Sequence, residues 1–518
     1  MNKYSRRDFL RFMGLGAASL VVPGCSNVAK LSTRDEFKDK PNIIFLMADD
    51  MGYGDLGCYG ATQIPTPNID RLASQGIRFT DAHAPSALCT PTRYGVLTGR
   101  YCWRTRLKKG VIYGHSKPLI KPDRLTVPSL LKQHGYKTAC IGKWHLGFDW
   151  AVKGETKEPQ EDGMNVDYTK TVKNGPLEFG FDYFFGIAAS LDMPPYCFIE
   201  NNHTVGIPTL EKYPYNTLQK KGLMPPGWKD ERVGPTFTRK AVNFIENNVK
   251  TRPNKPFFLY LPISAPHTPC TPPDFIKGRS SAGVRGDMVT EVDWTTGQIL
   301  DTLDRLNISE NTLIIVTSDN GALTVGLPDW AKDPPAKYDI EHFGHRPNGA
   351  LRGQKADIYD GGHREPFIAR WPGKIKPAST SDELICLIDL MATCAAIVGA
   401  KLPDNAAEDS YNILPALLDK KNHFPIREAL VHHSGEGMFS IRQGRWKLVL
   451  GRGSGGFSIP PHIEPKPHQP QGQLYDLQAD PAESNNLWAQ NPQIVERLTN
   501  LLDKYKQQGY SRPKKQKL

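Results

Sequence analysis

The chain has few cysteines, no internal repeat and, after its first thirty residues, no apolar run long enough to span a membrane. Its 518 residues include nine cysteines, whose irregular spacing argues against a disulfide framework. A small disulfide-rich module and a repeat array are therefore excluded. A chain of this length and ordinary composition predicts one large α/β domain with a smaller appendage, or two to three domains.

Charge of one sign is in modest excess. The formal net charge of +11 suits polyanionic partners, nucleic acid included. However, apart from a short basic tail at residues 512–517, lysine and arginine are spread along the chain, and no nucleic-acid-binding motif accompanies them. We therefore expect no nucleic-acid partner. A basic surface that only keeps the protein soluble would also explain the positive net charge.

Residues 1–30 have the pattern of an export signal. The pair Arg6-Arg7 precedes a short apolar stretch, as in twin-arginine signals. Val22-Pro23-Gly24-Cys25 is similar to a bacterial lipoprotein cleavage box with Cys25 as the lipidated residue, although the proline leaves cleavage without lipidation open. We expect export by the twin-arginine machinery to the periplasm or cell surface, with membrane attachment only through a lipid anchor.

Two nearly continuous apolar runs predict buried strands of a parallel sheet, at residues 42–47 and 312–317. Acidic or amide side chains follow both of them: Asp49, Asp50, Asp319 and Asn320. Ligands of open α/β sheets bind beyond the carboxyl ends of the strands. Hard oxygen donors of this kind suit Ca²⁺ or Mg²⁺, whereas Zn²⁺ sites favour histidine and cysteine.

The remaining pattern alternates between strands and helices. We expect helices at 68–75 and 288–306 and strands at 137–141 and 256–262, which predicts a large, mostly parallel sheet covered by helices on both faces, over residues 40–420. From residue 421 to 518, short strands separated by turns and a last helix predict a smaller α+β domain with an antiparallel sheet. Residues 451–472 should form a long loop near the active site.

Cys89 opens the run Cys-Thr-Pro-Thr-Arg. Thr90 is a good helix cap and Pro91 suits a first helical position, so Cys89 should lie at or just before a helix N-terminus. The N–H groups and dipole there favour an anion and lower the pKa of a thiol. From these residues alone, a buried structural cysteine, or one paired with Cys102, remains an alternative.

The extended run C-T-P-T-R-x-x-x-L-T-G-R, from Cys89 to Arg100, resembles the signature of type I sulfatases. Further family matches follow in order: Gly142-Lys-Trp-His-Leu-Gly147, Ala265-Pro-His-Thr-Pro269, Leu351-Arg-Gly-Gln-Lys355 and Asp360-Gly-Gly-His-Arg-Glu-Pro366, where Asp360 replaces the more usual glutamate. The resemblance implies an alkaline-phosphatase-like fold and hydrolysis of sulfate esters with release of inorganic sulfate. It also implies oxidation of Cys89 to formylglycine (3-oxoalanine) and one Ca²⁺ per chain.

The resemblance assigns a role to each matching side chain. Asp49, Asp50, Asp319, Asn320 and the modified residue 89 would bind the calcium ion. Lys143 and Lys355 would bind the sulfate group, and Arg93 would orient the hydrated aldehyde. His145 would contact the formylglycine and help to release sulfate, and His267 would protonate the leaving alcohol.

The family motifs define the sulfate subsite and say little about the alcohol. We expect a sulfated carbohydrate, with a hexose or N-acetylhexosamine 6-sulfate preferred and a 4-sulfate as the alternative. Residues 191–196 and the loops around Asn201 and residues 342–346 are expected to line the sugar subsite, and our candidate substrate-binding residues are His203, His342, His345 and Arg346.

Conversion of Cys89 requires a formylglycine-generating, sulfatase-maturing enzyme as a partner. Because the twin-arginine pathway moves folded proteins, this conversion can precede export. Two other functions stay open. One is a phosphate or phosphonate ester hydrolase of the same superfamily, against which Cys89, Thr92 and Arg93 argue, and the other is a catalytically silent lipoprotein that binds sulfated glycans.

Overall fold

The computed structural model describes residues 40–155, 157–214, 218–324, 343–420 and 424–513. The predicted export signal with Cys25, and the candidate substrate residue His342, lie outside these ranges. Within the described ranges, no helix combines the length and the apolar character needed to cross a membrane.

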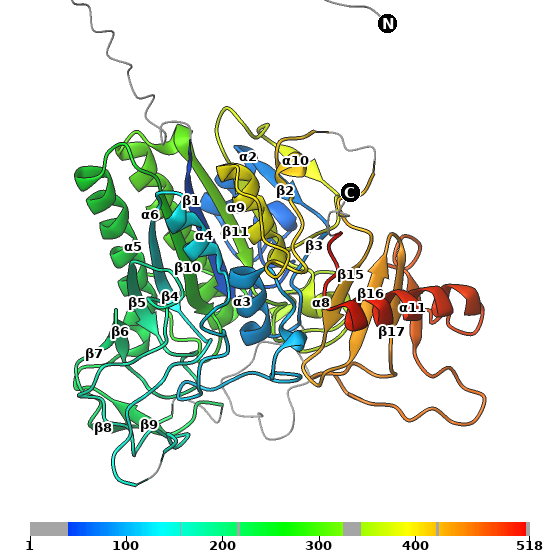
Figure 1. Ribbon diagram of the computed structural model, residues 1–518, viewed down its shortest axis with the longest axis horizontal. Helices are drawn as coiled ribbons and strands as arrows, with labels where there is room; N and C mark the ends of the chain where they lie inside the picture. Colours follow the sequence, from blue (N-terminus) through cyan, green and yellow to red (C-terminus); the bar gives the residue numbers. More distant parts are fainter. Residues whose placement is uncertain (1–39, 156, 215–217, 325–342, 421–423, 514–518) are drawn as a thin grey trace, which may run out of the picture. The chain divides into compact units, whose positions relative to one another are not determined.

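A sheet of ten strands forms the centre of the molecule (Figure 1). Its five central strands, β11, β1, β10, β4 and β5, are parallel, whereas antiparallel pairings occur toward both edges. In spatial order the strands are β13 (Ser379–Ser381), β2 (Ile77–Phe79), β12 (Phe367–Arg370), β11 (Thr312–Ser318), β1 (Asn42–Asp49), β10 (Phe257–Pro266), β4 (Lys137–Lys143), β5 (Tyr183–Ile187), β6 (Phe198–Glu200) and β7 (His203–Val205).

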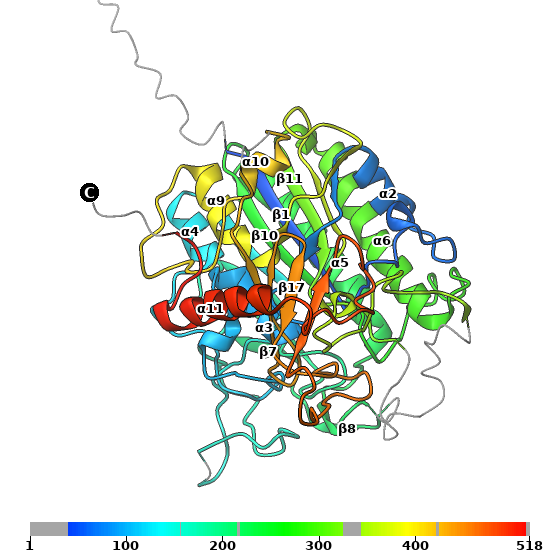
Figure 2. The same cartoon turned by 90° about the vertical axis from the view of Figure 1, so that its right-hand side faces the viewer.

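Helices cover both faces of this sheet (Figure 2). Successive side chains of a strand point to opposite faces, so Ile43 and Phe45 of β1 join one hydrophobic cluster while Ile44 and Leu46 join the other. One face packs against α2 (Pro67–Ser74), α5 (Val233–Thr251) and α6 (Gly283–Arg305). The other packs against α3 (Cys89–Thr98), α4 (Val127–Gln133) and α9 (Leu390–Val398). Burial on both faces explains why the central strands are nearly continuous apolar runs.

The C-terminal part forms a separate antiparallel sheet. Its strands are β15 (Leu430–His433), β16 (Phe439–Gln443), β17 (Trp446–Val449) and β18 (Gln473–Asp476). The amphipathic helix α11 (Pro492–Gln508) buries Leu498, Leu502 and Tyr505 against this sheet. Shorter elements include the strand pairs β3 (Ala82–His83) with β14 (Ile385–Cys386) and β8 (Leu210–Lys212) with β9 (Gly222–Met224), the helices α8 (Asp360–His363) and α10 (Leu414–Leu417), and several 3-10 turns.

The fold class is therefore confirmed. The strands expected at residues 42–47, 137–141, 256–262 and 312–317 form β1, β4, β10 and β11, and each is longer than the apolar run that predicted it. All eight described cysteines are free thiols, and all but Cys58 are buried. Cys89 and Cys102 are accordingly not a disulfide pair.

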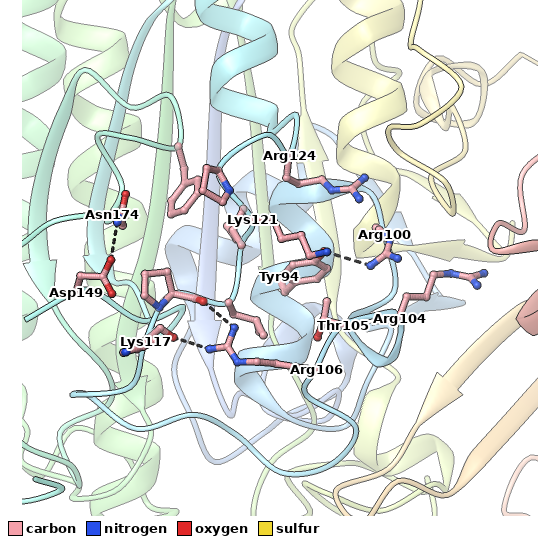
Figure 3. A pocket seen from close by; sticks show the side chains of 15 residues that line it. Tyr94, Arg100, Arg104, Thr105, Arg106, Lys117, Lys121, Arg124, Asp149 and Asn174 are labelled. Carbon is pink, nitrogen blue, oxygen red and sulfur yellow. Dashed lines mark hydrogen bonds between the residues drawn. The ribbon is translucent and has the colours of Figure 1, made fainter. Parts of the chain in front are cut away.

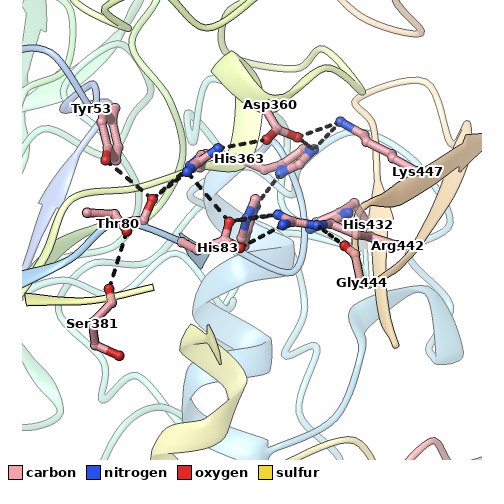
Figure 4. Close-up of polar contacts among 12 residues, drawn as sticks. Tyr53, Thr80, His83, Asp360, His363, Ser381, His432, Arg442, Gly444 and Lys447 are labelled. Carbon is pink, nitrogen blue, oxygen red and sulfur yellow. Dashed lines mark hydrogen bonds and ion pairs between the residues drawn. The ribbon is translucent and has the colours of Figure 1, made fainter. Parts of the chain in front are cut away.

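A buried polar network joins the C-terminal sheet to the residues around β3 and α8 (Figure 4). Lys447 of β17 contacts Asp360 at 2.8 Å and Glu483 at 2.7 Å. Arg442 of β16 binds both oxygens of Asp81, at 2.6 and 2.7 Å. Asp360, the residue that departs from the usual glutamate, thus lies at the contact between the two parts of the chain.

We predict that Lys447→Met strongly destabilises the protein. Burial alone would raise the pKa of Asp360, but Lys447 and neighbouring cations hold it well below its usual range, so the aspartate is ionised. Removing Lys447 leaves that buried charge without its main partner, a change that typically lowers stability by about 3–5 kcal/mol. Thermal or urea unfolding followed by circular dichroism measures the effect. Lys374→Met, at an exposed position, is the matched control, and equal stability of the two variants would contradict the prediction.

Candidate active site

Polar side chains from four central strands converge at one edge of the large sheet. Asp49 ends β1 and Lys143 ends β4, while Asp319 directly follows β11 and His267 directly follows β10. These four strands are mutually parallel, so their carboxyl ends meet at the same edge. The structure thus brings together, at this edge, the residues that the sequence singled out as ligand-binding candidates.

Three residues at this edge have left-handed backbone conformations. Asp50 has φ 66°, His145 has φ 55° and Ala356, beside Lys355, has φ 74°. Such a conformation is strained for a residue other than glycine and is maintained only where the surrounding structure demands it. The backbone is therefore shaped to hold the adjoining side chains at this edge.

Cys89 is the first residue of α3, and Leu88 is the N-cap. The helix therefore begins two residues earlier than predicted. Thr90 and Pro91, expected as its cap and first residue, lie inside its first turn. Burial raises the pKa of the Cys89 thiol to about 11, although Lys143 and Lys355 lower it. The expectation of a lowered pKa is therefore wrong, because loss of solvation outweighs the two lysines.

Three buried carboxylates are each held by a cation. The Arg93 guanidinium donates to Asp319 Oδ2 from Nη2 at 2.6 Å and from Nε at 3.0 Å. Lys143 Nζ lies 2.7 Å from Asp49 Oδ2, and Lys355 Nζ lies 2.7 Å from Asp50 Oδ2. Burial would raise the pKa of Asp49, but Lys143, His267, Arg93 and Lys355 hold it well below its usual range.

The same carboxylates form groups that could hold a metal ion. Ligand atoms of Asp49, Cys89 and Asp319 lie within 4.8 Å of one another, and so do those of Asp49, Asp50 and His267. Asn320 donates to Asp50 Oδ1 at 2.7 Å. Its own Oδ1, like Asp49 Oδ1, is buried and has no hydrogen-bond donor among the described residues, although Arg93 Nη2 lies 3.4 Å from Asp49 Oδ1. Unsatisfied oxygens among carboxylates fit a hard divalent cation such as calcium.

Two histidines at the edge have defined hydrogen bonds. His145 Nε2 lies 2.7 Å from the carbonyl of Ile112, which can only accept, so Nε2 is the donor and the buried Nδ1 has no partner. Burial, Lys143 and Arg93 hold the pKa of His145 well below its usual range, so the ring is neutral. His267 Nδ1 donates to the Thr268 carbonyl at 2.5 Å, which leaves Nε2 facing Asp50 Oδ2 at 3.6 Å.

Cys89, His267 and Lys355 line one cavity of about 470 Å³. Two regions singled out from the sequence contribute to its wall: Asp192 and Met193 come from the segment 191–196, and Gly456 and Phe457 come from the loop 451–472. The active-site position of that loop is thus confirmed.

Not every candidate substrate residue reaches this cavity. His203 lies exposed on the edge strand β7, His345 hydrogen-bonds Asp55 at 2.8 Å, and Arg346 is exposed. None of these three belongs to the described lining. The lining instead includes Tyr113, Lys220 and Glu436, which sequence reasoning missed. They lie on separate loops with no shared motif, although Lys220 Nζ sits 4.0 Å from the Tyr113 ring centroid.

Comparison with known proteins shows the family of this chain. A family model described as Sulfatase matches residues 41–400. The chain belongs to the sulfatase family. An N-acetylgalactosamine-6-O-sulfatase of Bacteroides thetaiotaomicron is 36% identical over 96% of this chain and 99% of its own. Human arylsulfatase A is 32% identical over 89% of this chain and 87% of its own.

A solved structure supports the same conclusion. A sulfatase of Bacteroides thetaiotaomicron, described in a study of glycosaminoglycan metabolism, is 36% identical, covers 90% of this chain and 100% of its own, and has a TM-score of 0.76. This sulfatase therefore hydrolyses sulfate esters, and the cavity that contains Cys89 is its candidate active site.

We predict that unmodified Cys89 is poorly reactive at neutral pH. With a pKa of about 11, only about one thiol in ten thousand is ionised at pH 7. In protein made without a maturing enzyme, the alkylation rate of Cys89 should keep rising above about pH 9, whereas in urea, with an ordinary thiol pKa of about 8.5, it should level off.

Mass spectrometry of the tryptic peptide 79–93 measures this rate, and circular dichroism at each pH confirms that the protein is folded. A rate in the folded protein that levels off below about pH 8 would show that the helix N-terminus and lysines prevail over burial.

Proposed function

We propose that this sulfatase removes O-sulfate groups from a glycan, with the 6-sulfate of N-acetylgalactosamine as the preferred substrate. The main support for this proposal is that Cys89, His267 and Lys355 line the same cavity as side chains suited to a sugar. Among these, Asp192 has a buried carboxylate oxygen, Oδ1, without a hydrogen-bond partner. A sugar hydroxyl or the N–H of an acetamido group can donate to it. The choice of sugar rests on the N-acetylgalactosamine-6-O-sulfatase of Bacteroides thetaiotaomicron, which is 36% identical to this chain.

The nucleophile in this proposal is formylglycine derived from Cys89. The cysteine thiol is a poor nucleophile here, because burial keeps it protonated. Once hydrated, the aldehyde would supply one hydroxyl to attack sulfur and a second hydroxyl whose deprotonation expels inorganic sulfate and restores the aldehyde. Because residue 89 is the first residue of α3, the backbone N–H groups of the helix N-terminus would lie near the sulfate oxygens in this proposal.

The surrounding side chains stabilise charge and move protons. Lys355 stays cationic: burial would lower its pKa, but Asp50, Cys89 and Asp49 hold it above its usual range. With Lys143, it neutralises charge that develops on the sulfuryl oxygens. His267 lines the cavity, and its Nε2, which is not used in the hydrogen bond to Thr268, would donate a proton to the leaving alcohol. Neutral His145 offers Nδ1 as an acceptor for the proton released when sulfate leaves.

Calcium is the proposed metal. Asp49, Asp50, Asp319, Asn320 and residue 89 would hold it, in keeping with their oxygen-rich donor set and with Asp49 Oδ1 and Asn320 Oδ1, which have no hydrogen-bond donor among the described residues. A bound divalent cation supplies Lewis acidity to a sulfate oxygen and neutralises the carboxylate cluster. Arg93 fixes Asp319 and, through Nη1, also donates to the Lys143 carbonyl at 3.1 Å, so it positions both groups.

Maturation and location are part of the same proposal. The twin-arginine pattern at Arg6 and Arg7 supports folding and oxidation of Cys89 by a sulfatase-maturing enzyme in the cytoplasm, followed by export to the periplasm or cell surface. Lipidation of Cys25 would anchor the exported protein to a membrane.

The substrate proposal predicts an order of rates. Release of sulfate from N-acetylgalactosamine 6-sulfate should exceed that from the 4-sulfate by about tenfold or more in kcat/KM, and an aryl phosphate should react more slowly than an aryl sulfate. Asp192→Ala should raise KM for the sugar sulfate about tenfold and leave the aryl sulfate nearly unaffected, because only the sugar donates to Asp192.

Asp404→Ala, at an exposed position, is the matched control for Asp192→Ala. Cleavage of the aryl sulfate without release of sulfate from any sugar would contradict the glycan proposal, and faster cleavage of the phosphate would favour the ester hydrolase alternative. Equal effects of the two substitutions would contradict the role of Asp192.

A further inference from the structure

A second cavity lies apart from the active site and shares no lining residue with it (Figure 3). Its volume is about 510 Å³, a size typical of small-ligand sites. Helix α3 connects the two cavities, because Cys89 lines the first and Tyr94 lines the second. We call it the basic cavity after the cationic side chains in its wall: Arg100, Arg104, Arg106, Lys117, Lys121 and Arg124.

Most of these cations have acidic partners. Arg100 and Arg124 share Glu408, at 3.1 and 2.8 Å. Arg104 binds Asp409 at 2.8 Å, and Lys117 binds Glu158 at 2.6 Å. Within the lining itself Asp149 is the acidic residue, and it lies beside Asn174 across the cavity from Arg100 and Arg104 (Figure 3).

Two cations of the basic cavity have no acidic partner among the described residues. Arg106 donates from Nη1 to the Pro118 carbonyl and from Nη2 to the Lys117 carbonyl, both at 2.7 Å, and in the described chain it forms no ion pair. Its remaining N–H groups are available to a ligand. Lys121 is exposed and likewise has no carboxylate partner among the described residues. The partnered and unpartnered cations together give the cavity an excess of positive charge, which favours an anion.

The rest of the wall is apolar. Leu119, Ile120 and Phe179 line the cavity together with Pro118 and Pro122. An apolar wall with a few convergent cations suits a ligand that combines a hydrocarbon face with a fixed negative charge. A free inorganic anion would use the cations alone, whereas a sugar that bears a sulfate group would use both parts of the wall.

We propose that the basic cavity is a second, non-catalytic binding site that holds a sulfated sugar unit of a glycan chain while another unit occupies the active site. The choice of glycan rests on the function proposed above, whereas the preference for an anion rests on the cavity itself. Binding at two sites on one chain raises the effective concentration of the substrate at the catalytic cavity. Long sulfated chains then bind more tightly than single sugars.

The test compares polymer binding in two pairs of variants. Arg106→Gln with Lys121→Gln removes the two unpaired charges, and Lys250→Gln with Lys376→Gln removes two charges at exposed positions outside the cavity. The probes are dextran sulfate, carboxymethyl dextran, unmodified dextran and inorganic sulfate, measured by calorimetry with full-length protein. The ratio of sulfate release from a chondroitin 6-sulfate chain to that from an aryl sulfate is measured alongside.

We expect the cavity variant to bind dextran sulfate about fivefold to tenfold more weakly than the control variant, as is typical for the loss of two exposed ion contacts. The polymer-to-aryl rate ratio should fall with it. Equal dextran sulfate affinities in the two pairs would overturn the proposal. If the cavity variant loses as much affinity for carboxymethyl dextran and inorganic sulfate as it loses for dextran sulfate, the cavity is a general anion site. That result would overturn the sulfated-sugar assignment.

A failure of the second binding site can be told apart from a failure of the proposed function, because dextran sulfate binding is measured without catalysis. Thermal unfolding reports whether each variant folds. Lys121→Gln alone, at an exposed position, provides a second variant that does not disturb the carbonyl contacts of Arg106, and it should reproduce part of the loss.

Discussion

The structure depends on one electrostatic constraint, the convergence of buried carboxylates at the carboxyl edge of the central strands. Asp49, Asp50 and Asp319 are each almost fully removed from solvent, and burial of ionised carboxylates is unfavourable unless cations accompany them. Lys143, Lys355 and Arg93 meet this requirement with contacts of 2.6–2.7 Å. The same arrangement that makes the charge tolerable also assembles the groups that we propose to bind a sulfate ester and a divalent cation.

The other parts of the fold serve this edge. The parallel strands bring Asp49, Lys143 and Asp319 together from positions far apart in the sequence, and α3 adds Cys89 and Arg93 from one face. The C-terminal sheet also contributes, because Gly435 donates its N–H to the carbonyl of Ala356, next to Lys355. The pairs Asp360–Lys447 and Asp81–Arg442 fix that sheet against the catalytic part. The C-terminal part of the chain thus helps to form the cavity that we propose as the sugar site.

The sequence predicted the strands well and singled out the polar residues that meet at their carboxyl edge, because apolar runs buried on both faces and short motifs at strand ends are local signals. It did not predict most of the residues that line the cavity beside Cys89. Tyr113, Lys220 and Glu436 meet only through the tertiary fold, and no local pattern marks them, whereas His345 was singled out by residue type and instead pairs with Asp55. The predicted lowering of the Cys89 thiol pKa was also wrong, because the complete burial of α3 cannot be read from a helix-start motif.

The central claim is that Cys89 acts as an aldehyde and not as a thiol. The most direct measurement is the mass of the tryptic peptide 79–93 from protein made in its own host, together with sulfate release by the same sample. We expect a peptide lighter than the cysteine form by the difference between CH₂SH and CHO, with activity proportional to the converted fraction. Full activity in a sample whose peptide carries only the unmodified thiol would contradict it.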